Sequence, residues 1–272
     1  MIRARVTRLA VFLFLLGFTL NLVGIVSHVA VSSFARRWFA TPLPLAWTTE
    51  WYAYSWREFQ LADVLTVTAI VAATVTALAL LLGFPAAYVL ARRGFPAKNA
   101  VLLLYFLPLL IPQMTYGIPL ATALYRYRIG GTISGVILAN LVPMLPLAIL
   151  VLLPFIEQIS ESLEWAARVH GAGRWQVFRR VVLPLALPGL LTAGLLVLVN
   201  TVANFELTFL LSGAGSQTLV VALYYAVFAA GMRPIYSVDA MAVIYMALVL
   251  LILVAALRLV RPTQMVFRIG GR

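Results

Sequence analysis

Residues 161–184 read ESLEWAARVHGAGRWQVFRRVVLP and form a charged stretch between two long apolar blocks. The pattern predicts a helix, a break at Gly171–Gly173, and a second amphipathic helix that ends at Pro184. Within the first helix, Ala166 and Ala167 leave a bare surface on which another backbone could pack closely. A helix–turn–helix placed between apolar blocks therefore indicates an element that docks a partner.

The composition of the rest of the chain places it in a membrane. Hydrophobic residues make up 64% of the 272 residues and charged residues 10%, and the mean hydropathy is +1.03. Soluble globular domains contain roughly half hydrophobic and about a quarter charged residues. This surplus excludes an ordinary soluble enzyme, a disordered chain and a fibrous repeat, because so much apolar surface must face lipid.

Six apolar blocks are each long enough for a membrane helix with some tilt. None shows the alternation that is typical of an outer-membrane barrel strand. The sequence therefore predicts an all-α, polytopic membrane protein with six transmembrane helices. Prolines in the third block predict kinks there, and a shorter apolar segment at 219–230 predicts a surface or re-entrant helix. The blocks cover about 6–33, 61–90, 100–124, 133–156, 183–211 and 238–260.

The first block has two interpretations. Three arginines precede it, and Ser33-Phe34-Ala35 resembles a signal-peptide cleavage site. The apolar region of a signal peptide is only ~7–15 residues long. This block is about twice that length, so we expect a retained helix.

The basic residues predict the orientation of the six helices. The loops and termini of one side hold fourteen of the 20 basic residues, so that side is expected to be cytoplasmic and to contain both termini. The basic residues form no continuous patch, so no nucleic-acid partner is expected. The fourteen are Arg3, Arg5, Arg8, Arg92, Arg93, Lys98, Arg168, Arg174, Arg179, Arg180, Arg258, Arg261, Arg268 and Arg272.

Residues for catalysis or nucleotide binding are scarce. The chain has no cysteine, two histidines and a single lysine, Lys98, which lies outside any Gly-x-x-x-x-Gly-Lys-Ser/Thr pattern. His28 and His170 lie in different surroundings, so we expect no metal site. An intramembrane enzyme is disfavoured because no nucleophile–base or metal set can be assembled.

Polar residues inside the apolar blocks mark candidate positions on a solute path, because they are costly in lipid. In the fifth block Asn200, Asn204 and Thr208 share one helical face by i, i+4 spacing, and Glu206 is the acid embedded beside them. Glu206 has two open interpretations: a neutral or arginine-paired group between helices, or a wall of the path.

Three further polar residues occur in or beside the spans. Asn140 and Gln113 are expected to form hydrogen bonds between helices and are second candidates for the path. Asp239 is expected to be an ordinary residue at the start of the sixth helix, where the helix dipole favours an acid.

The loop resembles the "EAA" motif of binding-protein-dependent ABC transporter permeases. That pattern is Glu-Ala-Ala, three residues, Gly-Ala, and then about ten residues ending in an apolar-Pro pair. Trp165 stands where the motif has its Glu, with Glu164 one residue earlier. The layout resembles this family from about residue 60 to 260, most closely the spermidine/putrescine-type permeases. The matching positions are Ala166, Ala167, Gly171, Ala172, Leu183 and Pro184.

The resemblance implies a fold, a location and partners. The loop at 157–183 would be a cytoplasmic coupling loop that sits in a groove of an ATPase subunit. The chain would lie in the bacterial inner membrane with a second permease, two ATPase subunits and an external solute-binding protein. It would be no enzyme and hold no cofactor, because ATP and Mg belong to the ATPase. Residues 1–60 would form the first helix and an external loop, 61–260 a five-helix core, and 261–272 a cytoplasmic tail.

Two alternatives remain at this stage. The loop helices could instead lie on the membrane surface, for which Trp165, Trp175 and Phe178 are suitable. The chain could also be a stand-alone secondary transporter, although no convincing internal repeat is visible. For an importer, the acid at Glu206 favours a polyamine-like cation as substrate, with sugar, iron or organophosphonate as alternatives.

Overall fold

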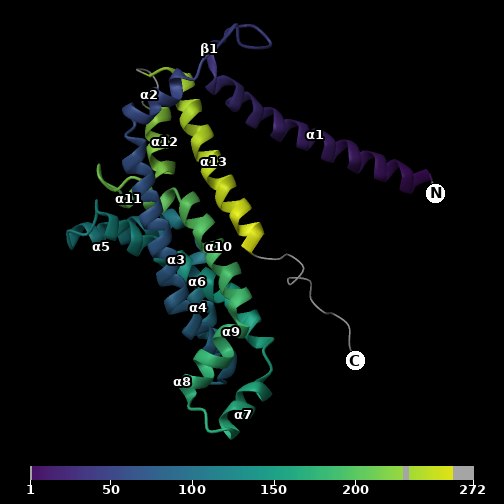
Figure 1. Ribbon diagram of the computed structural model, residues 1–272, viewed down its shortest axis with the longest axis vertical. Helices are drawn as coiled ribbons and strands as arrows, with labels where there is room; N and C mark the ends of the chain where they lie inside the picture. The colour runs from purple at the N-terminus through teal and green to yellow at the C-terminus, as the bar shows by residue number, and fades with distance from the viewer. Residues whose placement is uncertain (1, 229–232, 260–272) are drawn as a thin grey trace. The chain divides into compact units, whose positions relative to one another are not determined.

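The computed structural model describes residues 2–228 and 233–259, so the predicted tail at 261–272 lies outside the described residues. The chain divides into two compact units. One contains Met1–Ala62 and Leu223–Leu248, and the other contains Asp63–Ala222 and Val249–Arg272. Figure 1 shows the elements of both.

The first unit combines a long apolar helix with a polar cap. Helix α1 (Ile2–Ser33) has exposed side chains from residue 7 to 28, as suits a surface that faces lipid. After it come a small antiparallel pair of strands, β1 (Ala35–Arg37) and β2 (Ala46–Trp47), and helix α2 (Glu50–Glu58). Ser55 Oγ donates to the Ser237 carbonyl at the start of α13 (Ile235–Leu259), joining the cap to the last helix.

The second unit is built around α6, which packs against α4, α10 and α11. One core cluster contains Val75 and Leu207, and a second contains Ile149 and Val177. Its principal helices are α3 (Leu61–Arg92), α4 (Lys98–Leu110), α5 (Gln113–Arg126), α6 (Ile133–Glu157), α10 (Leu187–Ala203) and α11 (Glu206–Leu211).

Four helices of the described chain are long and apolar enough to cross a membrane, and two bent helix pairs would raise the number to six. The prediction of an all-α membrane protein is therefore confirmed, apart from the short strand pair. The apolar segment at 219–230 contains α12 (Leu219–Phe228), and residues 229 and 230 lie outside the described residues. The orientation of the termini stays a prediction.

The third apolar block is broken and not merely kinked. Helices α4 and α5 meet at an angle of 93°, with Ile111 and Pro112 in extended conformation between them. A residue before proline is disfavoured in helical conformation, so Ile111 ends α4. By contrast, α6 contains Pro143 and Pro146 and continues as one helix.

The fifth block, expected as one helix over 183–211, is also interrupted. A 69° bend separates Arg174–Leu185 from α10, and a second break at Asn204 and Phe205 separates α10 from α11. Asn204 has extended backbone (ψ 100°), so the helical hydrogen-bond ladder stops there.

The short helix α11 is locked against α5. A Cβ atom added at Gly117 would lie 2.9 Å from side-chain atoms of both Leu207 and Leu210, so the α5 backbone touches these leucines directly. Beyond the end of α5, the Gly131 N–H donates to the Leu211 carbonyl at 2.9 Å. These contacts hold α11 to α5 and to the turn that follows it.

Candidate functional site: a docking loop and a polar cavity

The predicted helix–break–helix is present between α6 and α10. Helix α7 (Glu161–Val169) begins after Ser160, whose hydroxyl accepts from the Ser162 N–H. Gly171 has φ +86°, the left-handed conformation that glycine adopts without steric cost, and it turns the chain into the next helix. Helices α7, α8 and α9 gather at one end of the second unit (Figure 1).

The second half of the loop corrects one expectation. The backbone runs from α8 (Arg174–Val177) through a π-helical turn (Phe178–Val182) into α9 (Leu183–Leu185), so Pro184 lies inside the helical run and does not end it. Proline cannot donate to the carbonyl four residues earlier. The π turn directly before Leu183 changes the hydrogen-bond register at this point, and the bend follows at Ala186.

Glu164 faces the interior of the protein. Its side chain is 5% exposed, and its Oε1 accepts from Arg92 Nε at 2.7 Å, while Tyr88 Oη donates to Oε2 at 2.6 Å. Arg92 also donates to the Ile159 carbonyl at 2.6 Å. Glu164 therefore fastens α7 to the end of α3, and as folded it does not face a partner.

The outward side of α7 carries exposed apolar side chains. Trp165 is 59% exposed and Val169 is 84% exposed, with exposed Ala166 on the same side. Gly171 and Pro184 are exposed as well. The remaining motif residues pack inward against the second core cluster as half-buried side chains: Ala167, Ala172 and Leu183.

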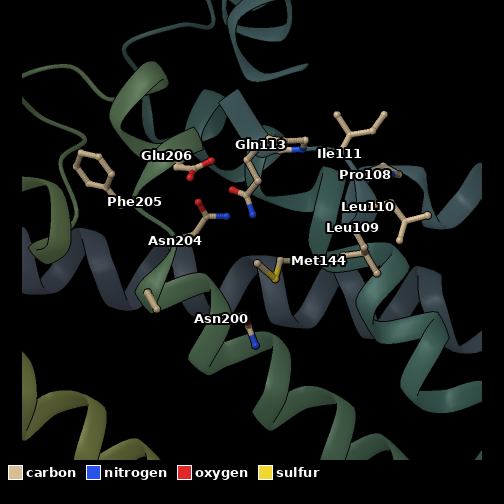
Figure 2. A pocket seen from close by; sticks show the side chains of 12 residues that line it. Pro108, Leu109, Leu110, Ile111, Gln113, Met144, Asn200, Asn204, Phe205 and Glu206 are labelled. Carbon is tan, nitrogen blue, oxygen red and sulfur yellow. The ribbon is translucent and has the colours of Figure 1, made fainter. Parts of the chain in front are cut away.

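A cavity of about 590 Å³ opens where α4, α5, α10 and α11 are interrupted. Its polar lining consists of Gln113, Asn200, Asn204 and Glu206. Figure 2 shows the side chains of Gln113, Asn204 and Glu206 gathered together, with Asn200 further along α10. The apolar lining comes from Pro108–Pro112, Met144, Ala203 and Phe205.

The breaks in the helices produce this polar cluster. Gln113 is the first residue of α5 and Glu206 the first of α11, while Asn204 lies in the extended link. Gln113 Oε1 and Asn204 Nδ2 are buried without a hydrogen-bond partner. No ion pair to Glu206 occurs within the described chain. Unpaired polar atoms in a cavity are positioned to bind a polar solute.

The predicted common face of Asn200, Asn204 and Thr208 does not form. The break at Asn204 ends the helical spacing on which the expectation depended. Thr208 is fully buried, and its Oγ1 accepts from Asn140 Nδ2 at 3.1 Å. Asn140 and Thr208 therefore join α6 to α11 behind the cavity, away from its lining.

Sequence reasoning did not identify the two residues that hold Glu164. Tyr88 and Arg92 bind this acid, and their i, i+4 spacing places them on one face of α3. Asp239 accepts a hydrogen bond from Ser32, but α13 begins at Ile235, so this acid lies beyond the first turn in which it was expected. Within residues 2–228 and 233–259, no three His, Asp or Glu side chains are grouped to hold a metal.

These features define a class: a multi-pass membrane protein with broken helices around a polar cavity and a docking loop at one end. Residues 79–265 match the family "Binding-protein-dependent transport system inner membrane component", which is more than half of the chain, and the chain belongs to this family. The description of the family names the inner-membrane component of a transport system.

Individual relatives agree with the family. The chain is 39% identical over 124 residues to the trehalose transport system permease protein SugB of Mycobacterium tuberculosis, covering 46% of this chain and 45% of the relative. It is 38% identical over 125 residues to the molybdate/tungstate transport system permease protein WtpB of Thermococcus kodakarensis, covering 46% and 50%. The matches thus span about half the length of these curated relatives.

A solved structure shows the same fold over nearly the whole chain. It is a bacterial ABC transporter involved in the import of the acidic polysaccharide alginate, with a TM-score of 0.72. The match covers 97% of both chains at 17% sequence identity. At this identity the similarity establishes the fold alone.

Proposed function

We propose that the chain is the transmembrane permease subunit of an ABC importer in the bacterial inner membrane. Its cavity forms part of the solute path, and α7 couples that path to a separate ATPase. The observation that carries this proposal is the outward surface of α7, where Trp165 and Val169 are exposed while Glu164 of the same helix is turned inward.

The arrangement of α7 favours a protein partner over the membrane surface. Leu163 and Trp165 are both exposed and lie about 160° apart around the helix, with Ala166 between them. A helix that lies on lipid can also carry an apolar face of this width, so the distinguishing feature is the small residue between the larger ones. Small Ala166 between larger side chains suits close packing in a groove, with Trp165 as the anchor.

The remaining partners are part of the same proposal. A second permease, two ATPase subunits and an external solute-binding protein would complete the importer, as the name of the family indicates for the last of these. ATP and Mg would be bound by the ATPase, and this chain would hold no cofactor. A stand-alone secondary transporter would leave the docking loop without a role.

For the substrate, the cavity supports a hydroxyl-rich solute best. Amides donate and accept, and the Glu206 carboxylate accepts, so together they match the mixed hydrogen bonding of a sugar. An oxyanion would be repelled by an ionised Glu206. The polyamine prediction stays a second candidate because of that carboxylate, but the relatives above, named for trehalose and molybdate, do not support it.

Docking through α7 predicts that Trp165→Glu weakens association with the ATPase about 30-fold or more, as expected for a tryptophan anchor. The matched control is Trp175→Glu, because Trp175 is also exposed but lies on α8, stacked on Phe178. The measurement is copurification of the ATPase and second permease from native membranes. Full copurification with the Trp165 variant would contradict docking through α7, and equal loss with both variants would point to a general effect of charge.

A second prediction concerns the turn. Gly171→Val should abolish stimulation of the ATPase by solute-loaded binding protein while leaving membrane insertion intact. A Cβ at Gly171 meets nothing within 4 Å, so the penalty comes only from the left-handed backbone, which a β-branched residue disfavours. Gly171→Asn, which tolerates this conformation, should retain stimulation. Full stimulation in the valine variant would refute the role of the turn.

A further inference from the structure

A second pocket lies between the end of α3 and α7, apart from the solute cavity. Its volume is about 250 Å³, and four arginines line it together with two acids. The full lining is Tyr88, Val89, Arg92, Arg93, Glu161, Glu164, Trp165, Arg168 and Arg174. Four positive charges against two negative ones leave the pocket net positive.

The positive charge is only partly compensated within the protein. Glu164 binds Arg92, and its Oε2 lies 3.9 Å from Arg168 Nη2. Arg93 and Arg174 form no ion pair with any residue that the structure describes. The Arg168 guanidinium also lies 5.1 Å from the centre of the Trp165 ring, which holds it at the pocket wall. The pocket thus contains guanidinium groups that are positioned to bind an anion.

We propose that this pocket binds the phosphate of an anionic membrane lipid. Arginine guanidinium groups match phosphate oxygens in planar, two-bond geometry. The volume is below the roughly 300–1,000 Å³ of sites for drug-sized ligands, so it suits a headgroup whose acyl chains remain outside.

The position of the pocket favours lipid as the source of the phosphate. Arg92 is the last residue of α3, an apolar helix long enough to cross a membrane, so the pocket lies at the level where the span ends. Basic pockets at this level are typical binding places for anionic headgroups. The pocket occupies the flank of α7 that faces α3 and shares only Trp165 with the outward docking surface. A bound lipid would contact α3 and α7 together.

The test uses the purified full chain in detergent and native mass spectrometry, with phosphatidylglycerol and phosphatidylcholine as probes. Wild type should retain one phosphatidylglycerol in preference to phosphatidylcholine. The double variant Arg93→Gln/Arg174→Gln removes the two unpaired charges and spares the Glu164 contacts. Its affinity for phosphatidylglycerol should fall about 25-fold, from about fivefold for each arginine.

The control variant is Arg179→Gln/Arg180→Gln, which removes the same charge from exposed residues of the same loop outside this pocket. It should bind phosphatidylglycerol like wild type, and equal weakening in both double variants would overturn the proposal. A third variant, Arg93→Lys/Arg174→Lys, keeps the charge but loses the two-bond geometry, so its affinity should lie between those of wild type and the glutamine variant. If it loses binding as fully as the glutamine variant while the fold is intact by circular dichroism, charge attraction to lipid is refuted.

Two further results would assign the pocket to another ligand. Inorganic phosphate is titrated by calorimetry against wild type and the Arg93→Gln/Arg174→Gln variant. Phosphate binding that depends on these arginines, with unchanged phosphatidylglycerol binding, would make the pocket a site for a soluble anion. If the Arg93→Gln/Arg174→Gln variant binds lipid like wild type but no longer copurifies with the ATPase, the pocket is a contact for an acidic side chain of the ATPase.

Discussion

Glu164→Gln is expected to lower the free energy of unfolding by about 3–5 kcal/mol, because it leaves the Arg92 charge buried without its partner. The Arg92 side chain is 11% exposed, so water replaces little of the lost interaction. The Tyr88 hydroxyl would also lose its charged acceptor. The measurement is reversible denaturation of the purified chain in detergent micelles, followed by tryptophan fluorescence.

The matched control is Glu161→Gln, which removes an exposed acid from the same helix without breaking an ion pair within the described chain. It should change stability by less than about 0.5 kcal/mol. The combined change Arg92→Met/Glu164→Leu should recover much of the loss, because it removes both buried charges together. If Glu164→Gln is no more destabilising than Glu161→Gln, the clamp between α3 and α7 contributes no stability.

Glu206→Leu is expected to reduce solute uptake by roughly 10- to 100-fold, the equivalent of losing one hydrogen bond to a charged group. Leucine keeps the bulk of the side chain but cannot accept a hydrogen bond in the cavity. The measurement is uptake of labelled solute by the assembled importer in proteoliposomes. Asp63→Leu, at an exposed acid in the first turn of α3, is the control and should transport normally.

The glutamine variant separates the two substrate classes. For a sugar, Glu206→Gln keeps an acceptor and adds a donor, so uptake should fall less than tenfold. For a polyamine, the same change removes the counter-charge, and uptake should fall as far as with leucine. Unchanged sugar and polyamine uptake in Glu206→Leu would show that this side chain does not line the path.

Much of the architecture follows from local sequence properties. Length and hydropathy suffice to identify the apolar helices, and the glycine at 171 suffices to identify the turn of the docking loop. The degree of bending cannot be predicted in this way, because the sequence does not distinguish the proline at 112 from the proline at 143. Pro112 lies in the break between α4 and α5, while Pro143 lies buried inside α6, and only packing around each proline decides between these outcomes.

In the polar cavity and the docking loop, the sequence likewise predicts which residues are polar but not what each side chain contacts. Glu206 and Gln113 were predicted as path residues from their polarity, and the structure places both at one cavity. Thr208 was grouped with Asn200 and Asn204 by helical spacing, which holds only while the helix is continuous. Glu164 was assigned to coupling by the motif, yet the direction of a helix face depends on what the helix packs against, and here the end of α3 captures the acid.

The lock between α5 and α11 bears on how an importer could alternate. Gln113 and Glu206 begin these two helices, and the direct backbone contact at Gly117 leaves little room for one to slide past the other. The distance between Gln113 and Glu206 therefore stays the same in each state of the importer. Opening and closing would then take place at the rims of the cavity, and the solute would meet the same pair of side chains on entry and on exit.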